Sequence, residues 1–176
     1  MEFKHTFIEG LIEIYPRIFG DERGYFLESY HKKNFADNGI PFDFVQDNQS
    51  SSTAGVLRGL HFQKEPYAQG KLVRVITGKA LDVAVDLRPG SPTFGKHQKF
   101  LLDSALQNMV YIPAGFAHGF LALEPCLFTY KCTNFYNKTS EGGIIWNDPE
   151  LGIDWGIENP NISQKDLELP RLKDIF

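Results

Sequence analysis

The architecture follows from the segment KLVRVITGKALDVAVDL, residues 71–87. Its first part, residues 71–76, is rich in branched apolar side chains, and residues 77–79 have the length of a hairpin turn. From residue 80 onward, alanine or aspartate alternates with large apolar side chains. The segment therefore predicts two strands, the second with a small acidic face that lines a polar cavity or faces water. Asp82 on that face, together with Lys71 on the preceding strand, favours the cavity.

Strand-like segments recur along the chain at a spacing of roughly ten residues. They cover residues 7–19, 25–30, 42–50, 55–63, 96–102, 109–123 and 128–136, and a turn is expected at residues 50–55. Helix is expected only over residues 31–38 and after a cap at Ser163. Many short strands with little helix predict an all-β sandwich or barrel of jelly-roll type with short flanking helices. Such a fold binds its ligand in the interior or at the mouth.

The length and composition fit one globular domain over residues 1–176, since 176 residues with 42% hydrophobic content can bury a substantial core. A net charge of -4 argues against nucleic-acid and anionic-membrane partners. No signal-like start and no long apolar run is seen, so a cytoplasmic protein is expected. Cys126 and Cys132 fit no common zinc spacing and are expected to be reduced and buried.

The most chemically capable segment is GVLRGLHFQ, residues 55–63, in which an arginine, a glycine and a histidine fall within four positions. It resembles the wall of a polar pocket, and His61 is our candidate for a general base. The local sequence also allows a second interpretation, a buried and hydrogen-bonded strand histidine. Strict alternation places Arg58 and His61 on opposite faces, so both enter one pocket only if the strand has a bulge or sharp twist near Gly59.

A catalytic metal is not expected. His61 and His118 are candidates to converge in a barrel, but the common barrel-metal pattern has two histidines one residue apart, and position 63 is Gln63. Too few ligands remain for zinc or iron, which generally take about three protein ligands in catalytic sites.

Metal-free proton transfer suits the residues better. A carboxylate on one histidine nitrogen fixes the tautomer, so the other nitrogen can take a proton. Lys71 supplies a fixed cation for a developing enolate. Alternation along residues 128–136 places two tyrosines, Tyr130 and Tyr136, on one strand face.

Six segments together carry a family resemblance: RGLHFQ (58–63), KLVRV (71–75), DVAVDLR (82–88), SPTFG (91–95), IPAGFAHGF (112–120) and WNDP (146–149). In this order and spacing they resemble the dTDP-4-dehydrorhamnose 3,5-epimerase family, from about residue 19 to residue 166. The resemblance implies a cupin-like jelly-roll homodimer in the cytoplasm that needs no metal or other cofactor. Its substrate would be a dTDP-4-keto-6-deoxy sugar, inverted at C3 and C5 on either side of the C4 ketone.

The same resemblance implies the roles of the site residues. His61 would be the base, Asp166 its orienting carboxylate, Tyr130 the acid on the opposite face, and Lys71 the stabiliser of the C4 enolate oxygen. Tyr136 would stack on thymine, and residues 19–28 would serve the barrel of the partner subunit. The implied substrate contacts are Arg23, Phe26, Glu28, Gln46, Asp47, Asn48, Arg58, His118, Tyr136, Glu141 and Lys165.

Two positions depart from the family pattern, with Gln49 where His is common and His97 where Trp is common, and we interpret both as tolerated variation. Three alternatives stay open. A related enzyme would epimerise only C3 or C5, and a sugar 3,4-ketoisomerase would use a similar barrel. From another class, a sugar-nucleotide-binding barrel without activity would not need the Tyr130 and Asp166 side chains.

Overall fold

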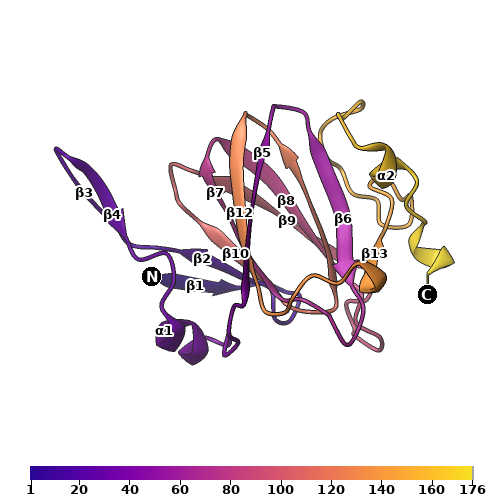
Figure 1. Ribbon diagram of the computed structural model, residues 1–176, viewed down its shortest axis with the longest axis horizontal. Coiled ribbons are helices and arrows are strands. Elements are labelled where there is room, and N and C mark those ends of the chain that lie inside the picture. Colours follow the sequence, from indigo (N-terminus) through magenta and orange to yellow (C-terminus); the bar gives the residue numbers. More distant parts are fainter. Residues whose placement is uncertain (176) are drawn as a thin grey trace.

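The computed structural model, which describes residues 1–175, consists of two antiparallel sheets and a projecting hairpin (Figure 1). The six-stranded sheet contains, in spatial order, β1 (Glu2–His5), β2 (Ile12–Tyr15), β10 (Met109–Ile112), β7 (Lys71–Thr77), β12 (Cys126–Cys132) and β5 (Gln46–Ser52). The five-stranded sheet contains β13 (Glu141–Gly143), β6 (Leu57–Gln63), β11 (Phe116–Ala122), β8 (Lys79–Asp86) and β9 (His97–Asp103). The predicted all-β, jelly-roll fold is confirmed.

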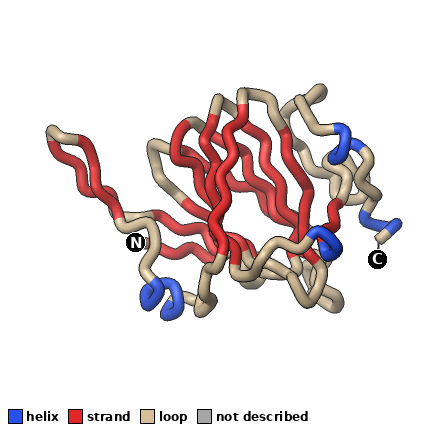
Figure 2. Tube along the Cα trace, in the orientation of Figure 1, coloured by secondary structure: helices blue, strands red, loops and turns tan. Residues whose placement is uncertain are grey.

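Within residues 1–175, the strands β3 (Ile18–Asp21) and β4 (Gly24–Leu27) pair only with each other, and their hairpin extends away from both sheets. We call these residues, 18–27, the arm. The helices are short and lie at the margins of the sheets (Figure 2): α1 (Lys32–Asp37), η1 (Lys138–Ser140), α2 (Gln164–Leu167) and η2 (Leu172–Asp174). None of the helices within residues 1–175 combines the length and apolar character that crossing a bilayer requires.

Alternation along β8 separates two cores. Ala80 and Ala84 face inward, into a core that contains residues of both sheets, such as Val73 on β7 and Phe120 on β11. Val83 and the other large side chains of β8 face outward, into a second core closed by residues 144–175. The small acidic face of β8 is thus the inner one and does not face water. Removing these apolar surfaces from water is the main source of stability for such a sandwich.

The turn at residues 77–79 forms where expected, but it does not make a hairpin. Strand β7 pairs with β10 and β12, whereas β8 pairs with β11 and β9. The turn therefore carries the chain from one sheet to the other. Gly78 has a φ of +76°, and a Cβ there would lie 2.2 Å from the Pro125 carbonyl oxygen, so the crossing requires glycine.

Two predicted strand boundaries were wrong. The serines at positions 50–52 belong to β5 and not to a turn, because β5 pairs with β12 along its whole length and small side chains such as the buried Ser52 fit this position. Strand β12 ends at Cys132, so Tyr136 is not on the strand face of Tyr130. It lies instead in an irregular connection, residues 133–137.

Candidate active site

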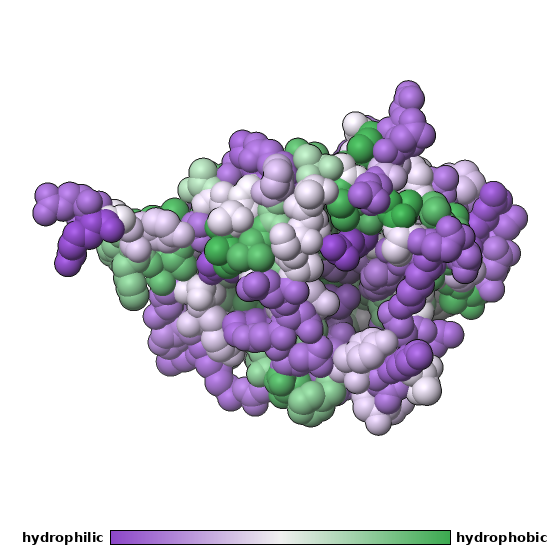
Figure 3. Space-filling model, turned by 45° about the horizontal axis from the view of Figure 1, so that its top comes forward, coloured by the Kyte–Doolittle hydropathy of each residue, from purple (hydrophilic) through white to green (hydrophobic). Residues whose placement is uncertain are grey.

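A cavity of about 610 Å³ lies between the two sheets, bordered by residues of the C-terminal segment. Figure 3 shows the hollowed face and the largely hydrophilic residues around it. All four predicted catalytic residues line the cavity, as do four of the predicted binding residues: His61, Lys71, Tyr130, Asp166, Asn48, Arg58, His118 and Lys165.

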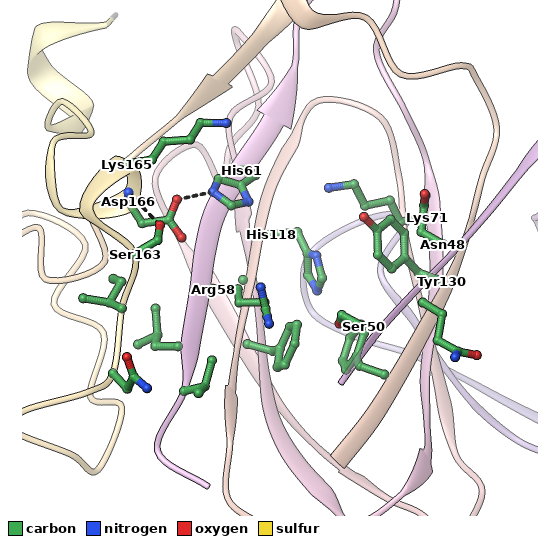
Figure 4. Close-up of a pocket in the computed structure, with 18 residues that line it drawn as sticks. Asn48, Ser50, Arg58, His61, Lys71, His118, Tyr130, Ser163, Lys165 and Asp166 are labelled. Carbon is green, nitrogen blue, oxygen red and sulfur yellow. Dashed lines mark hydrogen bonds and ion pairs between the residues drawn. The ribbon is translucent and has the colours of Figure 1, made fainter. Parts of the chain in front are cut away.

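His61 and Asp166 form a hydrogen-bonded pair on one wall of the cavity (Figure 4). The His61 Nε2 atom lies 2.7 Å from Asp166 Oδ1, and the Gly59 backbone N–H donates to Asp166 Oδ2 at 3.2 Å. Helix α2 presents Asp166, and its first turn is capped by the Ser163 hydroxyl. The His61 side chain is 34% exposed, so it is not a buried core histidine.

Burial of Asp166 tends to raise the pKa of its carboxyl group, but the hydrogen bonds from His61 and Gly59 and the charge of His61 outweigh this effect. The pKa of Asp166 therefore lies below its ordinary value, and its carboxylate is ionised at neutral pH. An ionised partner on Nε2 leaves Nδ1 of His61 as the nitrogen available for proton transfer.

The predicted irregularity at Gly59 is confirmed. His61 pairs with His118 and Arg58 pairs with Phe120, so β6 has one more residue than β11 over this interval, which defines a bulge. Gly59 has a φ of +117°, and a Cβ there would lie 2.5 Å from the Cα of Gly119. The bulge allows Arg58 and His61 to line the same cavity despite their spacing.

Lys71 and Tyr130 approach from the opposite wall (Figure 4), and the Lys71 ammonium lies 5.9 Å from the centre of the Tyr130 ring. Burial lowers the pKa of Lys71, although Cys132 and Asp82 act in the opposite direction. Burial also raises the pKa of Tyr130, an effect that Arg58 partly offsets. The wall thus holds an amino group whose charged form is disfavoured by burial, beside a phenol that keeps its proton at neutral pH.

A second histidine–carboxylate pair joins His118, which lines the cavity, to the fully buried Asp82. His118 Nε2 is 2.7 Å from Asp82 Oδ2, and both side chains are buried. The other carboxylate oxygen, Asp82 Oδ1, is buried and has no hydrogen-bond partner within residues 1–175. The acidic face of β8 therefore fixes the orientation of His118.

Three predicted substrate contacts do not reach this cavity. Arg23 and Phe26 lie on the arm, Glu28 follows it, and all three side chains are exposed. Phe26 is 70% exposed, and among the described residues Arg23 pairs only with Asp21, two positions earlier. Within a single chain, these residues are separated from the cavity.

Four further predicted contacts lie at or outside its rim. Tyr136 donates a hydrogen bond from its hydroxyl to Glu141, which also accepts one from Lys165 at 2.7 Å. The hydrogen bond from Lys165 lowers the pKa of Glu141. Gln46 accepts a hydrogen bond from the Tyr136 backbone, whereas Asp47 points away and pairs with Lys131.

Within residues 1–175, no group of three or more His, Cys, Asp or Glu side chains is arranged to hold a metal ion. Both cysteines are free and buried, as expected.

A family model described as dTDP-4-dehydrorhamnose 3,5-epimerase matches residues 5–174 of the chain. The chain belongs to this epimerase family. Among its relatives is a dTDP-4-dehydrorhamnose 3,5-epimerase of Shigella flexneri, 51% identical over 164 residues, which are 92% of this chain and 91% of the relative.

Two solved structures of epimerases are similar to this chain. The dTDP-6-deoxy-D-glucose-3,5-epimerase of Legionella pneumophila, in complex with dTDP-4-keto-L-rhamnose, is 46% identical with a TM-score of 0.95, covering 99% of this chain and 94% of that one. A 3'-monoepimerase of Streptomyces bikiniensis, in complex with dTDP-quinovose, is 34% identical with a TM-score of 0.89, covering 96% and 86%.

Asp82, which pairs with His118, and Ser163, which lines the cavity, were not among the sequence-predicted site residues. Asp82 was noted only as part of a cavity face, and its pairing with His118 requires β8 and β11 to be neighbours. Ser163 was predicted only as a helix cap, yet that cap presents Asp166. Strand alternation was the available signal for Asp82, whereas no local pattern reports which strands pair.

Proposed function

We propose that the chain epimerises dTDP-4-dehydro-6-deoxy-D-glucose at C3 and C5, giving dTDP-4-dehydro-L-rhamnose for dTDP-L-rhamnose biosynthesis. Its membership of the epimerase family supports this proposal, and the related Legionella enzyme is bound to a 4-keto sugar of this kind. One observation carries it in the structure. A histidine–carboxylate pair and a phenol–ammonium pair face each other across one cavity (Figure 4).

The chemistry follows from that arrangement. C3 and C5 are both α to the C4 ketone, so removing a proton from either gives an enolate whose charge collects on the C4 oxygen. His61 Nδ1 takes the proton, Asp166 stabilises the resulting imidazolium, and the Lys71 ammonium stabilises the enolate oxygen. Tyr130 returns a proton from the opposite face. A flip of the sugar ring brings the second centre to the same residues, and no redox step is involved.

Substrate binding combines charge and stacking. Arg58, His118 and Lys165 would neutralise the diphosphate, and Tyr136 would stack on thymine. Asn48 lines the cavity and would contact the substrate there, and Gln46 and Glu141, which hydrogen-bond Tyr136, would contact the nucleotide. Asp47 was also a predicted contact, but it points away from this cavity and pairs with Lys131.

Arg23 and Phe26 on the arm, with Glu28 just after it, would complete the site of a second subunit. We therefore propose a homodimer of single-domain chains that acts in the cytoplasm without a cofactor.

The test is an exchange experiment in deuterated water. The protein is incubated with dTDP-4-keto-6-deoxyglucose, and deuterium at C3 and C5 is followed by NMR. Incorporation at both carbons is expected. Incorporation at only one would identify a single-centre epimerase like the Streptomyces relative, and binding without any incorporation would leave only a sugar-nucleotide-binding protein.

His61→Asn provides the matched variant. We expect it to abolish incorporation at both carbons, because one base serves both. A positioned base contributes about 10²- to 10⁴-fold in rate, so the loss lies well within measurement. Exchange that persists in this variant would show that another group is the base.

A further inference from the structure

The segment that carries Tyr136 lies outside the strands, yet its backbone is held by side chains. Residues 133–137 follow the end of β12, and Tyr136 is 54% exposed. The Tyr136 backbone N–H donates to Gln46 Oε1 at 2.8 Å. An exposed aromatic residue on an irregular segment stacks with higher affinity when its backbone is already fixed, because ordering it on binding costs affinity.

Gln63 fixes this segment on both sides of Tyr136. Its Nε2 atom donates to the carbonyl oxygens of Phe135 at 3.1 Å and of Tyr67 at 2.6 Å, and its Oε1 atom accepts from the Asn137 N–H at 2.6 Å. Both amide hydrogens and the carbonyl oxygen are therefore used. Gln63 is 8% exposed, and its side chain has no amide hydrogen left for a ligand.

The position of Gln63 links two parts of the site. It ends β6, two residues after His61, and its strand partner across β13 is Glu141, which bonds the Tyr136 hydroxyl. The side chains of Gln63 and Gln46 thus hydrogen-bond the backbone around Tyr136, and Glu141 accepts a hydrogen bond from its hydroxyl. Together these bonds fix the position of the Tyr136 ring.

We propose that Gln63 is a positioning residue for nucleobase recognition, which holds Tyr136 in register with the cavity and contacts no substrate itself. This inference rests on the proposed function, in which Tyr136 stacks on the base. It also accounts for Gln63 at a position where a metal-binding barrel would have a histidine. Here the amide is needed because only an amide donates twice and accepts once in this geometry.

Gln63→Glu tests the proposal with an isosteric change. A carboxylate cannot donate to the two carbonyl oxygens, so both bonds are lost and an anion faces them. We expect KM for dTDP-4-keto-6-deoxyglucose to rise about tenfold, within the range of one lost base stack, while kcat at saturation stays near wild type. Gln98→Glu on β9, whose side-chain amide donates to the neighbouring Lys99 carbonyl, is the matched control and should change neither constant. An unchanged KM, or a kcat that falls while KM does not rise, would overturn the proposal.

Tyr136→Leu, alone and combined with Gln63→Glu, separates this inference from the proposed function. If Gln63 acts through Tyr136, the single Tyr136→Leu change raises KM and the double variant raises it no further. Additive increases would show that Gln63 acts elsewhere. If Tyr136→Leu leaves KM unchanged, the stacking role itself is wrong and the positioning role is wrong with it, although deuterium exchange at C3 and C5 would still support the epimerase.

A measurement on the wild-type protein covers the case in which Gln63→Glu does not fold. The Tyr136 and Asn137 amide hydrogens both donate to glutamine side chains. They should exchange slowly with deuterated water, in contrast to the exposed, unpaired amides expected of a free loop. Rapid exchange at both amides would overturn the proposal.

Discussion

At the scale of single residues, the Asp166 carboxylate joins catalysis to stability. It is ionised and buried, and it accepts hydrogen bonds from both His61 and Gly59. We expect Asp166→Asn to lower kcat by about 10²-fold or more, since the asparagine no longer favours the imidazolium form of His61. Deuterium exchange at C3 and C5 measures this loss.

The difference in stability between Asp166→Asn and the wild type should depend on pH. Because the folded-state pKa of Asp166 is lowered, its contribution to stability is fully present above the unfolded-state value, about 3.9, and is lost as the pH falls through the lower folded-state value. Thermal melts should therefore show Asp166→Asn less stable than wild type at pH 7, with the difference shrinking in acid. Asp154→Asn, at an 84% exposed side chain, is the control and should melt like wild type throughout. A difference that grows in acid would contradict the prediction.

At the scale of the strand, Gly59 determines which side chains share the cavity. A residue with a Cβ would need a φ of +117° and would approach the Gly119 backbone to 2.5 Å. We expect Gly59→Ala to destabilise the fold by about 2 kcal/mol or more, from backbone strain and overpacking together. Gly90→Ala shares the positive φ, +78°, but has nothing within 4 Å of its added Cβ, so it should cost less in urea unfolding. Equal losses would show that backbone conformation alone, and not the close approach, makes glycine necessary.

The strand scale also shows how far the sequence could predict the site. The conflict between alternation and a shared pocket was visible from Arg58 and His61, so the bulge could be predicted. Alternation along residues 128–136 failed for Tyr136, because β12 ends at Cys132 and side-chain amides from β5 and β6 hold the chain beyond it. Local periodicity carries no information on such long-range bonds. For the same reason it could not reveal that β7 and β8 belong to different sheets.

At the scale of the whole molecule, the arm is the feature that a single chain leaves unexplained. It projects from the body (Figure 1), and Phe19 and Phe26 are 51% and 70% exposed. Exposed apolar groups of this kind mark interaction sites. Arg23, Phe26 and Glu28 are predicted substrate contacts, and the proposed homodimer would bring them to the cavity of the partner.

Mixed dimers test this exchange directly. Arg23→Ala and His61→Asn each remove one part of every site, so each variant alone should be inactive or nearly so. If the arm serves the partner, a co-expressed mixed dimer has one site with both residues intact, and random pairing recovers about a quarter of wild-type activity. If the arm serves its own chain, every site lacks one residue and nothing is recovered.

Arg171→Ala is the control variant. This residue is exposed and lies outside both the arm and the cavity, so the variant should be fully active by itself. Absence of recovery in a verified mixed dimer would thus assign Arg23 to its own subunit or to no site, whereas recovery would explain why the arm extends beyond the body that bears it.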